Sequence, residues 1–145
     1  MAYLADTNVA ARWALPSDPL HAICRAAVEN LHAAGELVYI TAQNLVEFQA
    51  LATRPVSANG LGMSPADASA TATLMESTFP LAEENREVYP LWRNLVDTYS
   101  VVGRQVYDAR LVAVMQSSGL THLLTLNGPH FRQFPGITVV APNDV

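Results

Sequence analysis

Residues 3–8, YLADTN, place a carboxylate directly after a short apolar segment. The first three of these residues predict a buried strand, which Asp6 follows together with two small hydrogen-bonding side chains, Thr7 and Asn8. In parallel α/β sheets, ligands bind beyond the carboxyl ends of the strands. A turn residue that hydrogen-bonds the following backbone would also suit this position. The stretch therefore predicts a strand whose carboxyl end holds either a ligand or a turn.

Helix and strand signals alternate along the rest of the chain. Asp18 is a candidate N-cap and predicts a helix from Asp18 to Ala34. Residues 36–40, ELVYI, predict a second buried strand. Thr41 is then a candidate N-cap for a helix that must end before Pro55.

The second half of the chain continues the same alternation. It predicts helices over residues 64–79, 86–99 and 106–118, strands over 121–126 and 136–140, and a turn or short helix over 127–134. Short apolar strands that alternate with helices predict a parallel sheet covered on both faces. We therefore expect a single α/β domain over residues 1–145, in which helices flank a mostly parallel central sheet in three layers.

Composition narrows the class of protein. Half of the 145 residues are apolar and 14% are charged, which predicts a folded chain. No apolar run approaches the roughly 18 residues of a membrane span, and no signal peptide is recognisable, so we expect a cytoplasmic protein without a membrane partner. The one cysteine, Cys24, excludes an internal disulfide framework and a zinc site built on several thiolates, and we expect it in the core.

The charge balance points in two directions. Thirteen acidic residues against eight basic ones give a net charge of −5, unlike the basic footprint of a general nucleic-acid binder. All eight basic residues are arginines, which suit bidentate phosphate contacts. A genome composition that favours arginine codons would explain the same bias, so net charge does not decide between these classes.

Two further carboxylates lie where helical spacing predicts a core-facing surface. Asp108 shares a helix face with Leu111 and Val112, close to the start of its helix. Glu47 lies in an apolar helix next to Phe48. Each acid also has a structural explanation. A carboxylate such as Asp108 is favourable in the first turn of a helix, and a glutamate such as Glu47 can pack its methylene groups while its carboxylate reaches water. If Asp6, Glu47 and Asp108 converge, a hard cation such as Mg²⁺ or Mn²⁺ would relieve their repulsion.

Four segments in order resemble one known family. ADTNV (5–9), QNLVEF (43–48), YDARLVAVM (107–115) and the tail LLTLNGPHFRQFPGITVV (123–140) resemble the PIN-domain ribonucleases, in particular the VapC toxins of bacterial toxin–antitoxin pairs. The resemblance spans nearly the whole chain. It implies a PIN-like fold, with an open parallel sheet and flanking helices, that gathers three or four acids around one or two divalent ions and cuts RNA.

The resemblance also assigns roles to residues. It identifies Asp6, Glu47 and Asp108 as the metal ligands for Mg²⁺ or Mn²⁺. Many relatives carry a fourth acid at the position of Asn127 or of His130. Asn127 is therefore expected in the catalytic site as a neutral ligand or as a hydrogen-bonding partner of a bound water, and a tight second metal is not expected.

The resemblance implies partners as well. It implies a homodimer that a small cognate antitoxin inhibits, with an antitoxin helix in an apolar groove. We expect the helices from Asp18 to Ala34 and from Ser64 to Phe79 to form the walls of that groove.

Three functions remain compatible with the residues. The first is a metal-dependent endoribonuclease in which Thr7 and Asn8 orient ligands, and in which Arg110 neutralises phosphate, pairs with a site acid or is an ordinary surface residue. The second is a catalytically weakened PIN-like module that binds RNA or protein. The third is a metal phosphatase acting on small phosphoesters.

Overall fold

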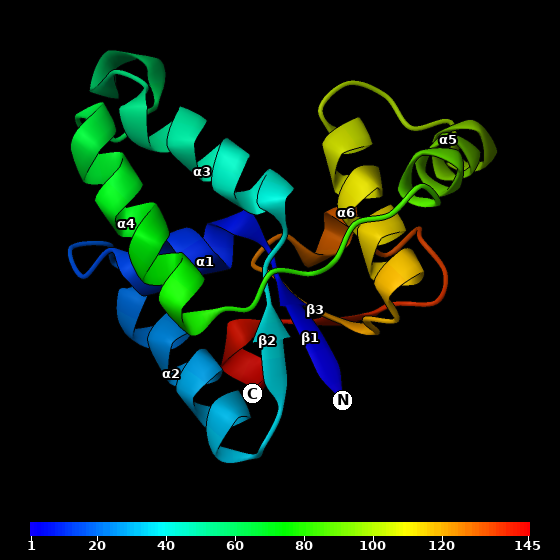
Figure 1. The fold of residues 1–145 in the computed structure, drawn as a ribbon, viewed down its shortest axis with the longest axis horizontal. Helices are drawn as coiled ribbons and strands as arrows, with labels where there is room; N and C mark the ends of the chain where they lie inside the picture. The colour runs from blue at the N-terminus through cyan, green and yellow to red at the C-terminus, as the bar shows by residue number, and fades with distance from the viewer.

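The computed structural model describes all 145 residues and places a four-stranded sheet between two groups of helices (Figure 1). All three strand pairings are parallel, and the strand order is β2-β1-β3-β4. The strands are β1 (Ala2–Ala5), β2 (Leu37–Tyr39), β3 (His122–Leu124) and β4 (Thr138–Val140). The predicted α/β fold with a parallel central sheet is confirmed.

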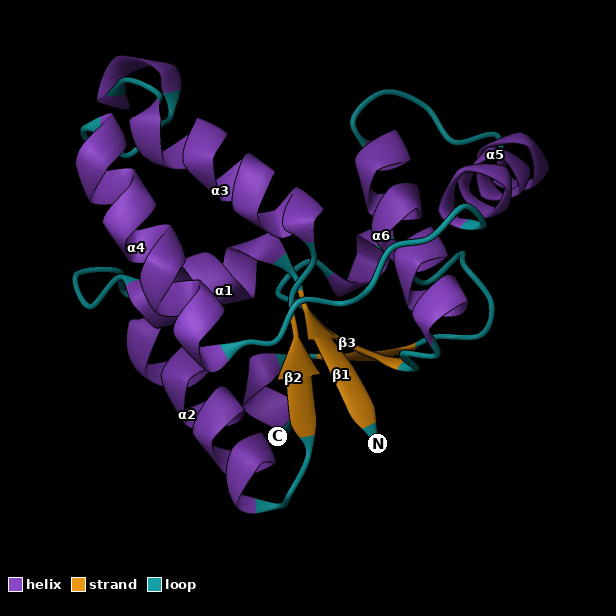
Figure 2. Cartoon of the chain, in the orientation of Figure 1, coloured by secondary structure: helices purple, strands orange, loops and turns teal.

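Six α-helices surround the sheet (Figure 2). They are α1 (Thr7–Ala14), α2 (His21–Ala33), α3 (Ala42–Thr53), α4 (Pro65–Thr78), α5 (Val88–Tyr99) and α6 (Gln105–Ser118). Three single 3₁₀ turns complete the structure, at Val56–Ala58, Gly128–His130 and Pro142–Asp144. None of these helices has the length and apolar composition that crossing a bilayer requires.

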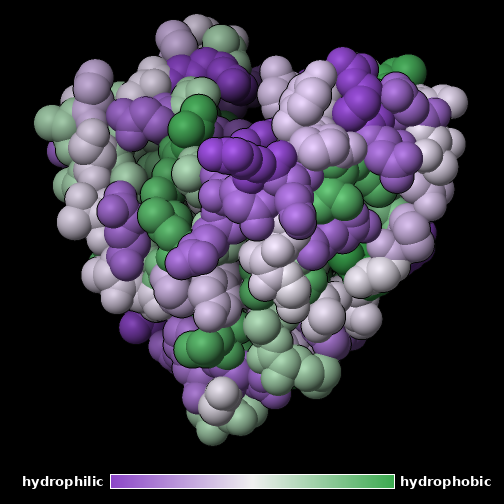
Figure 3. Space-filling model, turned by 45° about the vertical axis from the view of Figure 1, so that its right-hand side comes forward, coloured by the Kyte–Doolittle hydropathy of each residue, from purple (hydrophilic) through white to green (hydrophobic).

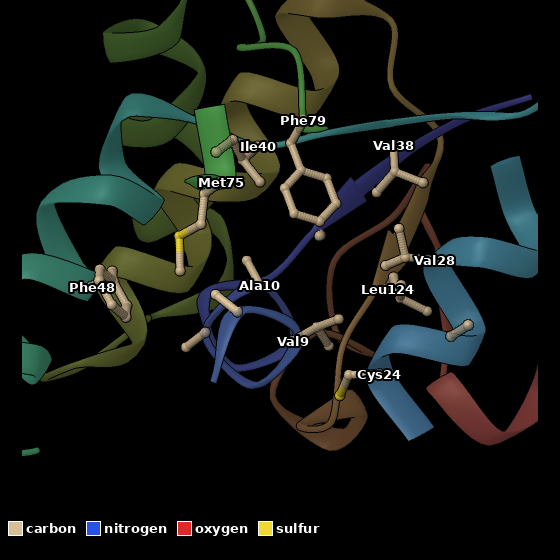
Figure 4. Close-up of a cluster of buried hydrophobic side chains, with 14 of the residues drawn as sticks. Val9, Ala10, Cys24, Val28, Val38, Ile40, Phe48, Met75, Phe79 and Leu124 are labelled. Atoms are coloured by element: carbon tan, nitrogen blue, oxygen red, sulfur yellow. The ribbon is translucent and has the colours of Figure 1, made fainter. Parts of the chain in front are cut away.

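Alternation along β1 divides the core in two. Tyr3 and Ala5 face the cluster built with α1–α4, whereas Leu4 faces the cluster built with α5 and α6. Successive side chains of a strand point to opposite faces, so one short apolar strand serves both cores. Figure 4 shows the first cluster, where Cys24 lies fully buried as predicted.

The predicted helix from Asp18 to Ala34 starts too early. The structure begins α2 at His21, because a side-chain oxygen of Asp18 accepts from the N–H of Leu20 and its carbonyl accepts from the N–H of His21. These bonds form a turn before the helix. The other predicted helices lie within about two residues of their expected bounds, which is the usual scatter of helix ends.

Helix α1 was not predicted at all. It has only eight residues, and the side chain of its N-cap residue, Asp6, accepts a hydrogen bond from the N–H of Thr7. The sequence shows Asp6 as the end of a strand, but the same residue also begins a helix. The strand and the helix therefore meet at one carboxylate.

Candidate active site

The candidate site lies at the point where the strand order reverses. The chain places β2 on one side of β1 and β3 on the other, so connections leave β1 in both directions. In open α/β sheets, such a switch point leaves a crevice beyond the carboxyl ends of the strands. Asp6 lies at that end of β1, as the sequence predicted, and is only 6% exposed.

Thr125 holds Asp6 from the neighbouring strand. Ala5 pairs with Leu124 in the sheet, so the residues after them lie side by side. The Thr125 hydroxyl donates to Asp6 Oδ2 over 2.7 Å, and its oxygen accepts from the N–H of Asn127 over 3.0 Å. The strand predicted over residues 121–126 included Thr125, but β3 ends at Leu124, so sequence reasoning did not identify this residue.

Asn8 and Thr7 extend this network in two directions. Asn8 Nδ2 donates to Asp6 Oδ2 over 3.2 Å, and Asn8 Oδ1 accepts from the N–H of Leu126. The Thr7 hydroxyl donates to Glu47 Oε2 over 2.8 Å. The two residues after Asp6 therefore orient acids of the site, one on each side, as the sequence suggested.

Helix α3 carries Glu47, and its start is fixed by a capping box. The Thr41 hydroxyl accepts from the N–H of Asn44, and the Asn44 side chain accepts from the N–H of Thr41. Asn44 Nδ2 in turn donates to the Thr7 hydroxyl over 2.8 Å. Thr41 and Asn44 are both buried, so this network is shielded from water. It sets the position of Glu47 against α1.

Gln43 links Glu47 to the far side of the site. Gln43 Nε2 donates to Glu47 Oε1 over 2.7 Å and to the carbonyl of Tyr107 over 2.9 Å. Gln43 Oε1 accepts from Arg110 over 3.0 Å, and Arg110 also forms an ion pair with Glu84 at 2.8 Å. Of the roles considered for Arg110, the structure shows pairing with Glu84, which is not one of the predicted site acids. Gln43 was missed, although it lies one turn before Glu47.

Asp108 approaches the group from α6. It lies in the first turn of that helix, while Leu111, Val112 and Met115 on the same face are buried. His130 Nδ1 lies 3.7 Å from Asp108 Oδ2. The imidazole of the last 3₁₀ turn before β4 therefore faces a site acid.

Asn127 takes a different position. Its side chain is exposed and makes no hydrogen bond, and its N–H donates to Thr125. Of the two residues in the place of a fourth acid, His130 is thus the one in contact with the acids. A catalytic role for Asn127 stays a prediction.

Burial and mutual repulsion raise the pKa of two of the acids. Burial raises the pKa of Asp6, the hydrogen bond from Thr125 lowers it, and the charge of Glu47 adds a smaller increase. Burial, followed by the charge of Asp6, raises the pKa of Asp108 to about 6. These carboxylates are near enough to influence one another, so the structure brings the predicted acids into one electrostatic group.

The donor set fits a hard divalent cation. It consists of carboxylate oxygens from three separate elements, which is the ligand chemistry of Mg²⁺ and Mn²⁺. No three acidic, histidine or cysteine side chains converge to coordinate an ion as the structure stands. Asp6, Glu47 and Asp108 are the residues that would hold a cation.

Comparison with known proteins shows which solved structures share this fold. No family model and no curated protein matches the sequence. Solved structures do match. A chain of VapBC2 from Rickettsia felis, bound to a promoter DNA fragment, is similar with a TM-score of 0.71 and 15% identity, over 97% of this chain and 98% of that chain. The chain has the fold of the PIN-domain toxins.

Two further solved structures are similar to this chain over nearly its full length. A toxin–antitoxin complex from Klebsiella pneumoniae gives a TM-score of 0.64 at 21% identity, over 99% of both chains. VapC20 of Mycobacterium tuberculosis, described as a toxin that cleaves the sarcin–ricin loop, gives 0.63 at 18% identity over 90% of this chain and 94% of that chain. The expected PIN-like architecture is therefore confirmed over nearly the full length.

Proposed function

We propose that this chain is a divalent-metal-dependent endoribonuclease and the toxin of a toxin–antitoxin pair. The observation that carries the proposal is the buried carboxylate of Asp6 at the switch point, grouped with Glu47 and Asp108 on a PIN fold. The description of VapC20 as a cleaving toxin supports the substrate class.

Asp6, Glu47 and Asp108 would hold Mg²⁺ or Mn²⁺. When bound, such an ion supplies Lewis acidity at the phosphate and lowers the pKa of a water nucleophile. The chain's own residues prepare the ligands. Thr125 and Thr7 fix the carboxylates of Asp6 and Glu47 through their hydroxyl hydrogen bonds.

His130 and Asn127 belong to the same proposal. His130 lies beside Asp108, where an imidazole can donate to a phosphate oxygen of the substrate. Asn127 lies after β3 on the exposed side of the site, where its amide can contact substrate or a bound water. Arg110 is held by Glu84 and Gln43, so its role is to position α3 against α6.

A cleavage assay tests the activity. Purified protein with Mn²⁺ or Mg²⁺ is incubated with a broad panel of single-stranded RNAs, and cleavage is expected to stop in EDTA. Each metal ligand should contribute several kcal/mol, so Asp108→Asn and Glu47→Gln should each lose at least about a hundredfold in rate. Glu29→Gln is the matched control, because Glu29 is exposed on α2 and pairs only with Arg25. Intact RNA in every metal-loaded reaction would contradict the proposal.

The alternative is a PIN-like module that binds RNA or protein without cutting. The missing fourth acid and the open arrangement of the three carboxylates favour it. Calorimetric titration with Mn²⁺ separates the two, since a catalytic site should bind the ion and Asp108→Ala should abolish binding. A phosphatase assay on a small phosphoester tests the third function.

The proposed partners are a cognate antitoxin and a second copy of this chain. The match from Klebsiella pneumoniae comes from a toxin–antitoxin complex. In this chain α2 and α4 both pack against α1, and α4 exposes Leu74 at 48%. We propose that an antitoxin helix lies along α2 and α4. Light scattering that shows a stable monomer would contradict the proposed homodimer.

A further inference from the structure

A second surface feature lies next to the acids. A pocket of about 390 Å³ opens beside the start of α5 and the first turns of α6. Its lining combines three apolar and three polar residues: Asn85, Arg86, Val88, Tyr89, Trp92 and Arg110. None of the proposed metal ligands lines it, so it is a separate feature from the acid group.

Aromatic rings form one wall of this pocket. The rings of Tyr89 and Trp92 lie 5.8 Å apart with a tilt of 37°. Trp92 is held in place, because its Nε1 donates to the carbonyl of Val106 over 2.7 Å. Tyr89 is 62% exposed and therefore contributes little to the core. The wall thus presents one fixed ring and one exposed ring to solvent.

Three arginines lie at the same wall. Arg86 and Arg110 line the pocket, and Arg93 lies against the two rings. The Arg93 guanidinium lies 5.3 Å from the Trp92 ring centre and 5.9 Å from that of Tyr89. Arg86 is exposed and forms no ion pair. The pocket therefore joins aromatic faces to a cation that is free to meet a phosphate.

The pocket is connected directly to the candidate active site. Arg110 lines the pocket and donates to Gln43, and Gln43 donates to Glu47. Two side-chain hydrogen bonds therefore separate the pocket wall from a proposed metal ligand. Figure 3 turns the α5–α6 side toward the viewer, and strongly hydrophilic and intermediate residues dominate its upper right.

We propose that this pocket binds a nucleobase of single-stranded RNA, stacked on Tyr89 and Trp92, with Arg86 beside the neighbouring phosphate. Every base offers a π-face to an aromatic ring, and arginine adds a phosphate contact, so this combination is typical of single-strand binding. The inference rests on the proposed function, since it names a contact for the RNA of that same site.

Binding of a short RNA tests the pocket without any need for cleavage. A fluorescently labelled single-stranded hexanucleotide is titrated with the protein in EDTA, and anisotropy gives the Kd. Tyr89→Leu is the main variant, because Tyr89 is exposed and its loss should not disturb the core. Loss of one stacked base should weaken binding by between about five- and a hundredfold.

A matched control and a second change make the test specific. Leu37→Ala removes apolar surface from another exposed side chain, 55% exposed, at the start of β2 and outside the pocket, and its Kd should stay within about twofold of wild type. A series of hexanucleotides with one abasic position each should include one that binds wild type more weakly. That abasic position should make no difference to Tyr89→Leu, because the stacking is already lost.

Each outcome decides the inference. Tyr89-dependent binding without cleavage in Mn²⁺ would support the pocket and contradict the nuclease function. Cleavage with an unchanged Kd and kcat/KM in Tyr89→Leu would support the function and overturn the pocket, as would the absence of RNA binding. If light scattering shows that Tyr89→Leu turns a dimer into a monomer, the aromatic wall is a subunit contact and the inference is wrong.

Discussion

Thr125 offers the sharpest test of how the site holds its buried acid. Thr125→Val keeps the shape of the side chain but removes the hydroxyl that donates to Asp6 Oδ2 over 2.7 Å. Asp6 is 6% exposed, so water cannot easily replace the lost donor. Hydrogen bonds to charged groups contribute about 1.5–3 kcal/mol, and we expect Thr125→Val to lose about 2 kcal/mol of unfolding free energy when Asp6 is ionised.

The loss should depend on pH in a defined direction. The Thr125 hydroxyl lowers the pKa of Asp6, which burial raises, so its removal raises that pKa further. A group with a raised folded pKa loses stability as pH rises through that value. The difference between variant and wild type should therefore be larger at about pH 8 than at about pH 4.5, because acid protonates Asp6.

Urea titrations in EDTA at the two pH values measure this difference. In a thermal melt, 2 kcal/mol corresponds to a fall in Tm of about 4–8 °C for a domain of this size. Thr121→Val is the matched control, because Thr121 is exposed and its hydroxyl contacts only His122. Wild-type stability of Thr125→Val at the higher pH, or an equal loss at both pH values, would refute this role of Thr125.

Three further outcomes are expected. In EDTA, the free energy of unfolding should fall by on the order of 1–2 kcal/mol between about pH 4 and 6, because folding raises the pKa of Asp108 to about 6. Urea titrations of Asp108→Asn should show a smaller fall, since Asp6 still has a raised pKa in that variant. Mn²⁺ at a hundred times its Kd should stabilise the wild type by about 2.7 kcal/mol in thermal melts, and equal stabilisation of Asp108→Asn would count against the proposed site. His130→Asp should tighten Mn²⁺ binding about tenfold in calorimetry, and more than Asn127→Asp, because His130 already lies 3.7 Å from Asp108. Unchanged affinity in both variants would place this turn outside the site.

The acids could be predicted because each breaks a local rule. Asp6 interrupts an apolar run at a strand end, and Asp108 lies on the buried face of its helix. Helical period and strand end are properties of a few consecutive residues, so the sequence displays them directly. The same reasoning placed Glu47 in α3 and found Thr41 as its N-cap.

The residues that hold the acids could not be predicted in this way. Thr125 is 119 residues from Asp6 in the chain, and Gln43 is 67 from Arg110. Such contacts depend on strand order and helix packing, which local patterns do not specify. Glu84 lies outside any helix or strand, so its pairing with Arg110 had no periodic signal at all. Helix α1 was missed because its cap was interpreted only as the end of a strand.

The sequence offered two interpretations of Asp6, a ligand site or a turn residue, and its hydrogen bonds are compatible with both. Its Oδ1 caps α1 by accepting from Thr7, and its Oδ2 accepts from Thr125 and Asn8. A carboxylate has about four acceptor sites, so these three bonds leave about one of them open on Oδ1.

The other two acids keep more acceptor capacity. Glu47 accepts one hydrogen bond on each oxygen, and Asp108 accepts none. Buried or half-buried carboxylates with open acceptor sites are costly unless a charge compensates them. His130 supplies such a charge to Asp108 only when it is protonated. The divalent cation of the proposed function would compensate all three acids at any pH at which they are ionised, and this supports the proposal.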